Sequence, residues 1–204
     1  MKKDIQTVIF DFGGVLIDWN PAYVYRQVFD DEKEMDYFFE NICTFEWNAM
    51  QDAGRPLVEA TEWLVKRHPE YESHIRTYYD RWQEMLGGPI HGTVDLLGTV
   101  YTQNKHRLYG LTNWSHETFP VALELYDFLH RFEGIVVSGT EKVKKPDQKI
   151  YDILLERYDI KPETAFFIDD SHNNVLAAQA LGINAVQFHS PEQLKEALQE
   201  WEIL

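Results

Sequence analysis

Short apolar runs alternate with longer amphipathic stretches along much of the chain. Residues 5–10 form a short, β-rich run that ends at Asp11, which predicts a buried strand. Four similar runs follow after residue 100, at residues 107–111, 134–137, 164–168 and 183–188. Beside them, apolar residues recur at helical spacing in residues 93–101, 151–158, 173–181 and 193–201. Strands that alternate with helices predict an α/β fold, in which helices cover both faces of a parallel sheet.

Residues 16–88 break this alternation. No strand-like run stands out there, and the amphipathic stretches are Tyr23–Phe29, Met35–Ile42, Leu57–Val65 and Ile75–Met85. The simplest interpretation is a helical block inserted after the first strand, with Gly87-Gly88-Pro89 as a hinge back to the sheet. We therefore expect a core made of residues 1–15 and 90–204, and a helical cap made of residues 16–89.

The composition excludes several classes of protein. The chain has 204 residues, of which 34 are acidic and 19 basic, for a formal net charge of −15. This excess of acid argues against nucleic-acid binding, because a phosphate backbone is bound by clustered Lys and Arg. No apolar run approaches the roughly 20 residues that cross a bilayer, and the N-terminus lacks the apolar stretch of a signal peptide. The one cysteine, Cys43, fits a reducing compartment, so we expect a cytoplasmic protein with neither nucleic acid nor membrane as partner.

Four short polar segments lie where open α/β sheets bind their ligands, at the carboxyl ends of predicted strands. They are Phe10–Val15, Leu111–Trp114, Lys144–Asp147 and Phe166–Ser171. Their reactive side chains are a carboxylate, a hydroxyl, an ammonium and two adjacent carboxylates, from Asp11, Thr112, Lys145 and Asp169-Asp170. This set suits phosphoryl transfer, in which a carboxylate attacks phosphorus, cationic groups hold the phosphate and carboxylates bind a hard cation.

The order and spacing of these segments resemble the motifs of the haloacid dehalogenase superfamily of aspartate-nucleophile hydrolases. The resemblance covers nearly the whole chain and implies a three-layer, Rossmann-like core with an inserted helical cap. The first segment, Asp11-Phe12-Gly13-Gly14-Val15, is similar to the Asp-x-Gly-(Gly/Asn)-Val motif of bacterial sugar-1-phosphate phosphatase-like members. The resemblance implies a Mg²⁺-dependent phosphatase. Its substrate would be a small phosphorylated metabolite, with sugar phosphates as a candidate class, and it would act through an aspartyl-phosphate.

Positions carried over from the family give each residue an expected role. Asp11 would be the nucleophile and a Mg²⁺ ligand, together with the carbonyl of Gly13 and the carboxylate of Asp170. Asp169 would support Asp170 without binding the ion as directly. The phosphate oxygens would be held by Thr112, the backbone amide of Asn113 and Lys145. Lys145 would also offset the repulsion between the attacking carboxylate and the phosphate. A simpler interpretation of Asp169-Asp170 is that they cap the helix that follows, which is compatible with metal binding.

One position departs from the family pattern. Most phosphatases of this superfamily carry a second Asp two residues after the nucleophile as general acid and base, and this chain has Gly13 there. Substitutes available in the sequence are Asp18, Asp52, His91 and His116, and nothing in the sequence selects among them. Without a substitute, good leaving groups are favoured, so a sugar-1-phosphate should react faster than the matching 6-phosphate.

Two other functions compete with the phosphatase. A haloacid dehalogenase also uses an Asp nucleophile but needs no metal, and the paired acids Asp169 and Asp170 favour a metal. A non-catalytic protein that binds a phosphorylated ligand is consistent with the loss of the acid at Gly13. The sequence does not determine the substrate or the oligomeric state.

Overall fold

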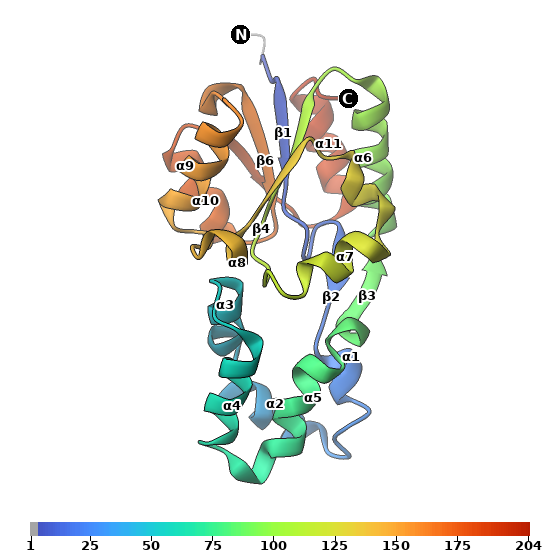
Figure 1. The fold of residues 1–204 in the computed structure, drawn as a ribbon. Coiled ribbons are helices and arrows are strands. Elements are labelled where there is room, and N and C mark those ends of the chain that lie inside the picture. The colour runs from blue at the N-terminus through green and yellow to red at the C-terminus, as the bar shows by residue number, and fades with distance from the viewer. Residues whose placement is uncertain (1–3) are drawn as a thin grey trace.

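The computed structural model describes residues 4–204 and is built around a five-stranded parallel sheet (Figure 1). Its strands are β1 (Thr7–Phe10), β4 (Arg107–Thr112), β5 (Gly134–Val137), β6 (Ala165–Asp169) and β7 (Asn184–Gln187). They lie in the order β5-β4-β1-β6-β7, and all pairs are parallel. The five strands confirm the predicted α/β fold. The first three residues of the expected core segment 1–15 lie outside the described residues.

Helices cover both faces of the sheet, because the side chains of its buried strands alternate between two apolar clusters. Val8 and Phe10 of β1 face the cluster that includes residues of α6 (His91–Gln103) and α11 (Pro191–Glu200). Ile9 faces the other cluster, with residues of α9 (Gln148–Arg157) and α10 (His172–Ala180). Figure 1 shows these two pairs of helices on opposite sides of the sheet. All four helices overlap the stretches predicted from helical spacing, whereas α7 (Phe119–Leu125) and α8 (Ser138–Glu141) were not foreseen.

The inserted segment forms a helical block below the carboxyl ends of the strands (Figure 1). It contains α1 (Ala22–Tyr25), α2 (Glu32–Asn41), α3 (Phe45–Asp52), α4 (Leu57–Val65) and α5 (Glu72–Asp80). Two of these helices begin at a capping side chain, since Asp31 accepts a hydrogen bond from the amide of Lys33 and Thr44 accepts one from that of Trp47. Buried aromatic rings fill the block, among them Tyr25, Phe38 and Tyr78.

The expectation that residues 16–88 contain no strand was wrong. The chain leaves the core through β2 (Ile17–Trp19) and returns through β3 (Leu86–Pro89), and these strands pair antiparallel. Both are too short for a periodic pattern, and Gly87-Gly88-Pro89, which was expected to be a hinge, resembles a strand only once its distant pairing partner is known. We propose that this two-stranded ribbon joins a core of residues 1–15 and 90–204 to a cap of residues 16–89.

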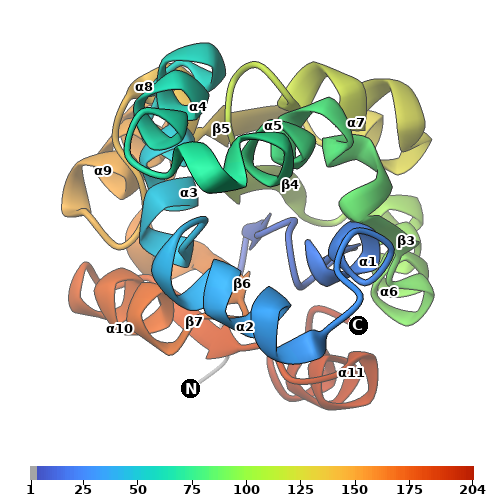
Figure 2. The same cartoon turned by 90° about the horizontal axis from the view of Figure 1, so that it is seen from below.

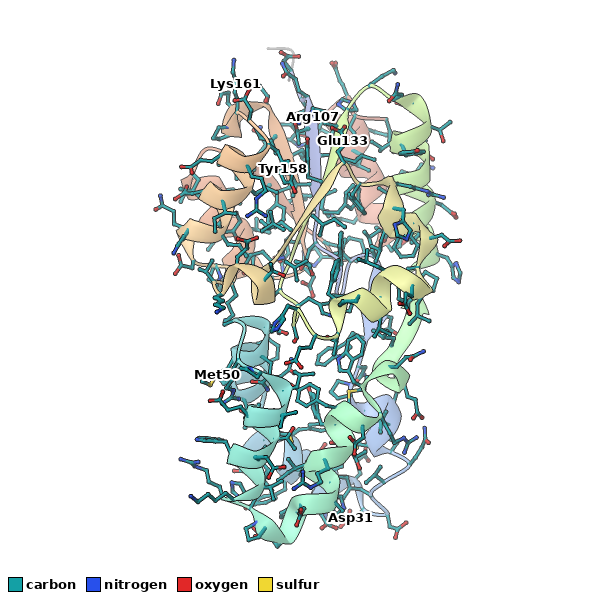
Figure 3. The ribbon with its side chains drawn as sticks, in the orientation of Figure 1. Asp31, Met50, Arg107, Glu133, Tyr158 and Lys161 are labelled. Carbon is teal, nitrogen blue, oxygen red and sulfur yellow. The ribbon has the colours of Figure 1, made fainter. Side chains whose placement is uncertain are left out.

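A polar cluster lies at the end of the sheet opposite the helical block. Figure 3 shows Arg107, Glu133 and Tyr158 close together at the edge of the sheet that faces away from the helical block. Arg107 pairs there with Glu133 (Nε–Oε2 3.3 Å) and donates to the carbonyl of Tyr158, which ties the amino ends of two strands to α9. Asp31 and Met50 lie on the helical block. No helix within residues 4–204 is long and apolar enough to span a membrane.

Candidate active site

The predicted site residues meet at the point where the strand order changes direction. From the central strand β1 the chain adds β4 and β5 on one side and then β6 and β7 on the other, which leaves a crevice at the carboxyl ends of the strands. A cavity of about 530 Å³ lies there. Its wall includes five of the expected site residues, Asp11, Gly13, Asn113, Lys145 and Asp170. Figure 2 shows helices of the inserted block lying over this end of the sheet.

Asp11 is buried and held on one oxygen. Its Oδ1 accepts a hydrogen bond from the amide of Phe12 (2.8 Å) and pairs with Nζ of Lys145 (2.9 Å). No described residue donates a hydrogen bond to Oδ2, so that oxygen is available to a substrate or a cation. Burial raises the pKa of Asp11, with Lys145 opposing this shift and Asp169 adding to it.

Lys145 lies at the centre of the charged cluster. Its Nζ contacts Oδ2 of Asp169 at 2.7 Å and the carbonyl of Leu111 at 2.8 Å, and the side chain has no solvent exposure. Burial would lower the pKa of Lys145, but Asp11 and Asp169 outweigh it and raise the pKa above its usual value. Lys145 is therefore a fixed cation next to the carboxylate of Asp11.

Asp169 is fully buried and has partners on both oxygens. Oδ1 accepts hydrogen bonds from the amide of Ser171 (2.8 Å) and from Nδ2 of Asn174 (2.9 Å), and Oδ2 accepts from Asn174 and Lys145. With four hydrogen bonds from three donor groups around it, Asp169 orients its neighbours more readily than it binds a ligand directly. The supporting role expected for Asp169 stays a prediction.

Asp170 is exposed and lies against the loop that follows β1. A Cβ atom at Gly14 would come within 2.4 Å of its Oδ2, and Gly14 has a φ of +73°, so only glycine suits this position. Burial and the neighbouring charge of Asp169 raise the pKa of Asp170, with Lys145 opposing.

The donor set fits a divalent cation. One carboxylate oxygen from each of Asp11, Asp169 and Asp170 lies within 4.8 Å of the other two. Hard cations such as Mg²⁺ are held by carboxylate and carbonyl oxygens, and a cation there would favour the ionised forms of Asp11 and Asp170. Gly13 lines the same cavity, which places its backbone beside this set.

Of the residues expected to bind phosphate, Asn113 and Lys145 line the cavity and Thr112 does not. The side chain of Asn113 accepts from the amide of Lys145 (2.8 Å) and donates to its carbonyl (3.0 Å), so it locks the segment that carries the lysine. The hydroxyl of Thr112 is buried without a hydrogen-bond partner among the described residues, and Thr112 is not part of the cavity wall. Binding of phosphate by Thr112 stays a prediction.

Two other features of the cavity have no local pattern in the sequence. Its wall carries the aromatic side chains of Trp19, Phe45, Tyr79, Trp82 and Trp114. Ser138 of α8 donates a hydrogen bond to the carbonyl of Asp52 and accepts one from the amide of Trp114 (2.9 Å), so it links α3 to the core. The contact joins residues 86 positions apart, and no local pattern announces such a pair.

Known proteins resemble this chain over most of its length. The model of the haloacid dehalogenase-like hydrolase family matches residues 8–188. The sesquiterpene phosphatase astK of Aspergillus oryzae is 26% identical over 199 residues, which cover 98% of this chain and 96% of that protein. The phosphorylated carbohydrates phosphatase of Thermotoga maritima is 27% identical over 185 residues, covering 89% of this chain and 84% of that protein. A solved HAD family enzyme from Bacteroides thetaiotaomicron, a magnesium complex, superposes with a TM-score of 0.73 at 23% identity, covering 97% and 100% of the two chains.

Proposed function

Since the chain belongs to the haloacid dehalogenase-like hydrolases, we propose that it is a Mg²⁺-dependent phosphatase that cleaves small phosphate monoesters. The observation that carries this proposal is the cluster at the cavity wall: Asp11 fixed by Lys145 at 2.9 Å, with Asp169 and Asp170 within ligand distance. A reactive carboxylate, a buried ammonium and an acidic pair suit phosphoryl transfer through an aspartyl-phosphate. Relatives that act as phosphatases support the same reaction class.

Asp11 is the nucleophile in this proposal. Because two donors hold its Oδ1, the carboxylate cannot rotate freely, and Oδ2 stays directed at the bound ester. Attack on phosphorus forms an aspartyl-phosphate and releases the alcohol, and water then hydrolyses the acyl phosphate to regenerate Asp11.

Lys145 reduces the repulsion between two anions. A carboxylate that approaches a phosphate ester meets strong Coulomb repulsion, and a buried ammonium beside both lowers that barrier. The hydrogen bonds from Asn113 to its backbone and the ion pair with Asp169 keep Nζ in place, so the stabilisation needs no rearrangement during the reaction.

Magnesium would be held by Asp11, Asp170 and the carbonyl of Gly13, with Asp169 behind them. When bound, the ion supplies a Lewis acid that stabilises charge on the phosphate oxygens. The solved magnesium complex of a HAD family enzyme with this fold supports the choice of metal.

The cavity limits the substrate to a small molecule. A volume of about 530 Å³ is in the range of ordinary metabolite sites. The two phosphatase relatives are named for a terpene and for carbohydrates, so the part of the substrate beyond the phosphate is not carried over from them. We keep sugar phosphates as the first class to test.

The test is a phosphate-release screen over phosphorylated metabolites with and without Mg²⁺. The proposal predicts release that requires Mg²⁺ and falls to background in Asp11→Asn, which keeps the size of the side chain and removes its nucleophilicity. Halide release from a haloacid without metal, together with no phosphate release, would assign the chain to the dehalogenases instead.

A further inference from the structure

We propose that Asp52, at the end of α3, is the general acid and base of this phosphatase. The inference rests on the function proposed above and adds the proton donor that the position of Gly13 lacks. Asp52 belongs to the helical block, so the site would have its proton donor only when α3 lies against the core.

The core offers no acid at the usual place. A Cβ atom built on Gly13 has no neighbouring heavy atom within 4 Å, so no nearby side chain has taken over the space of the missing carboxyl. A proton donor therefore has to reach the ester from another element.

Among the four substitutes available in the sequence, Asp52 alone lines the cavity with Asp11 and Gly13. Asp18 accepts a hydrogen bond from Tyr23 and packs against Gly87, in the ribbon rather than in the cavity wall. His91 and His116 are exposed and are not part of the wall.

Other titratable groups of the wall have different tasks. Tyr79 donates to Oδ1 of Asn48 (3.1 Å) and accepts from Gln51 (2.8 Å), and burial raises its pKa. Asp170 lies against Gly14 in the proposed metal set. Among the acidic residues of the described cavity wall, this leaves Asp52 as the one that does not belong to the proposed metal set.

The core holds Asp52 in place. Its carbonyl accepts a hydrogen bond from the hydroxyl of Ser138, and its carboxyl receives a backbone hydrogen bond from Ser115, in the loop after β4. Asn48, one turn earlier on α3, donates to its Oδ2 (3.5 Å). Gly54 approaches the carbonyl of Gly139 so closely that a Cβ atom there would lie 2.9 Å away. The end of α3 is thus docked on α8, and Asp52 lies in the wall of the cavity.

The surroundings of Asp52 suit a group that exchanges a proton near neutral pH. Burial raises its pKa to about 7, while the charge of Lys144 and the hydrogen bond from Ser115 oppose the shift. Tyr78 and Tyr79 of α5 also face it, and both stay neutral because burial raises their pKa values as well. A general acid works best when its pKa lies close to the working pH.

The proposed steps balance in protons and electrons. In the first, Oδ2 of Asp11 forms a bond to phosphorus, the bond from phosphorus to the ester oxygen breaks, and that oxygen takes the proton of the Asp52 carboxyl to leave as an alcohol. In the second, the Asp52 carboxylate takes a proton from water as the water oxygen attacks phosphorus, and the bond from phosphorus to Asp11 breaks. The products are an alcohol and inorganic phosphate, with both side chains restored.

Two aryl esters of similar shape test this role. Phenyl phosphate has a poor leaving group that needs a proton, and para-nitrophenyl phosphate has a good one that does not. We expect Asp52→Asn to lower kcat/KM on phenyl phosphate by about 10²–10⁴-fold and on para-nitrophenyl phosphate by less than about 10-fold. Glu46→Gln, an exposed acid on the same helix, is the matched control and should change neither.

A rescue experiment distinguishes proton transfer from structural damage. Placing a carboxyl in the open space at Gly13, as Gly13→Asp in the Asp52→Asn background, should restore turnover of phenyl phosphate at least in part. Asp52→Ser, which also lacks the acid, should show the same dependence on the leaving group. An equal loss on both esters without rescue would overturn the assignment of Asp52. The proposed function would still stand if the wild type turns over both esters and Asp11→Asn does not, and it would fall if the wild type releases phosphate from neither.

Discussion

At the scale of single residues, the chemistry of the site depends on the balance of charge around Lys145. Its ammonium contacts the carboxylates of Asp11 and Asp169, and Asp170 lies within 4.8 Å of both acids. Two charges about 4 Å apart interact by roughly 4 kcal/mol at an effective dielectric constant near 20, so a phosphate dianion would be strongly repelled by a site with excess negative charge. A divalent cation removes that excess, which is the physical reason to expect magnesium here.

Loss of Asp170 should therefore weaken magnesium binding first. We expect Asp170→Ala to raise the Mg²⁺ concentration for half-maximal turnover by more than about 10-fold, because Mg²⁺ tolerates a missing carboxylate poorly. Titration calorimetry with Mg²⁺ measures the same loss without substrate. Asp95→Ala, an exposed acid on α6, is the control. Unchanged Mg²⁺ affinity in Asp170→Ala would remove this residue from the metal site.

At the scale of elements, the sequence predicted the parts that carry a local pattern. The five strands of the sheet and the helices beside them have apolar runs or helical spacing, and all were found close to the expected residues. The strands β2 and β3 were missed because each owes its conformation to a partner about 70 residues away, and α8 was missed because four residues show no period.

The site residues that strand order places could be predicted from the sequence, whereas a residue placed by packing between distant helices could not. Asp169 ends a strand, Asp11 and Asp170 follow strands and Lys145 precedes a helix, so strand order alone brings them to one edge. The sequence could name Asp52 only as one of four alternatives, because its place depends on how α3 packs against α8.

The docking of α3 can be tested at Gly54. This residue has a φ of +95°, and a Cβ atom there would lie 2.9 Å from the carbonyl of Gly139. We expect Gly54→Ala to push α3 off the core and to lower turnover of phenyl phosphate more than that of para-nitrophenyl phosphate. Gly88→Ala is the matched control, since Gly88 has a φ of +103° with no heavy atom within 4 Å of the added Cβ. Both variants should lose roughly 1–2 kcal/mol of stability from backbone strain, and equal kinetic effects would argue against the docking contact.

At the scale of the whole molecule, we propose that the site lies between a core and a cap that contact each other at several places, among them the edge-to-face rings of Trp82 and Trp114. The ribbon of β2 and β3 carries both chain crossings, and α3 touches α8 on the opposite side of the molecule (Figure 1). Separation of α3 from α8 would open the cavity to water and move Asp52 away from the ester. Asp11 and Lys145 would stay together in the core. Closure would thus control proton transfer without altering the nucleophile.

The free energy of unfolding should depend on pH in a way that reflects the buried Asp52. Its pKa rises from 3.8 to about 7 on folding, so the folded state binds a proton that the unfolded state releases. Stability from this group is present below about pH 4 and is lost as pH rises toward 7. Asp52→Asn lacks this loss, so its free energy of unfolding relative to wild type should increase over that interval by up to about 4 kcal/mol and then level off. Denaturant unfolding of both proteins across the interval measures the difference, and a constant difference would mean that Asp52 titrates normally.

Rapid acid quenching during turnover gives the most direct test of the central claim, that Asp11 is a nucleophile toward phosphorus. Mixing the enzyme with Mg²⁺ and para-nitrophenyl phosphate, quenching in acid and mapping peptides by mass spectrometry should find one phosphoryl group on the peptide that carries Asp11, formed as fast as the first nitrophenol is released. Asp11→Asn should show neither the modified peptide nor the burst. Full turnover with the phosphoryl group on another residue, or with no covalent species during the burst, would contradict the account.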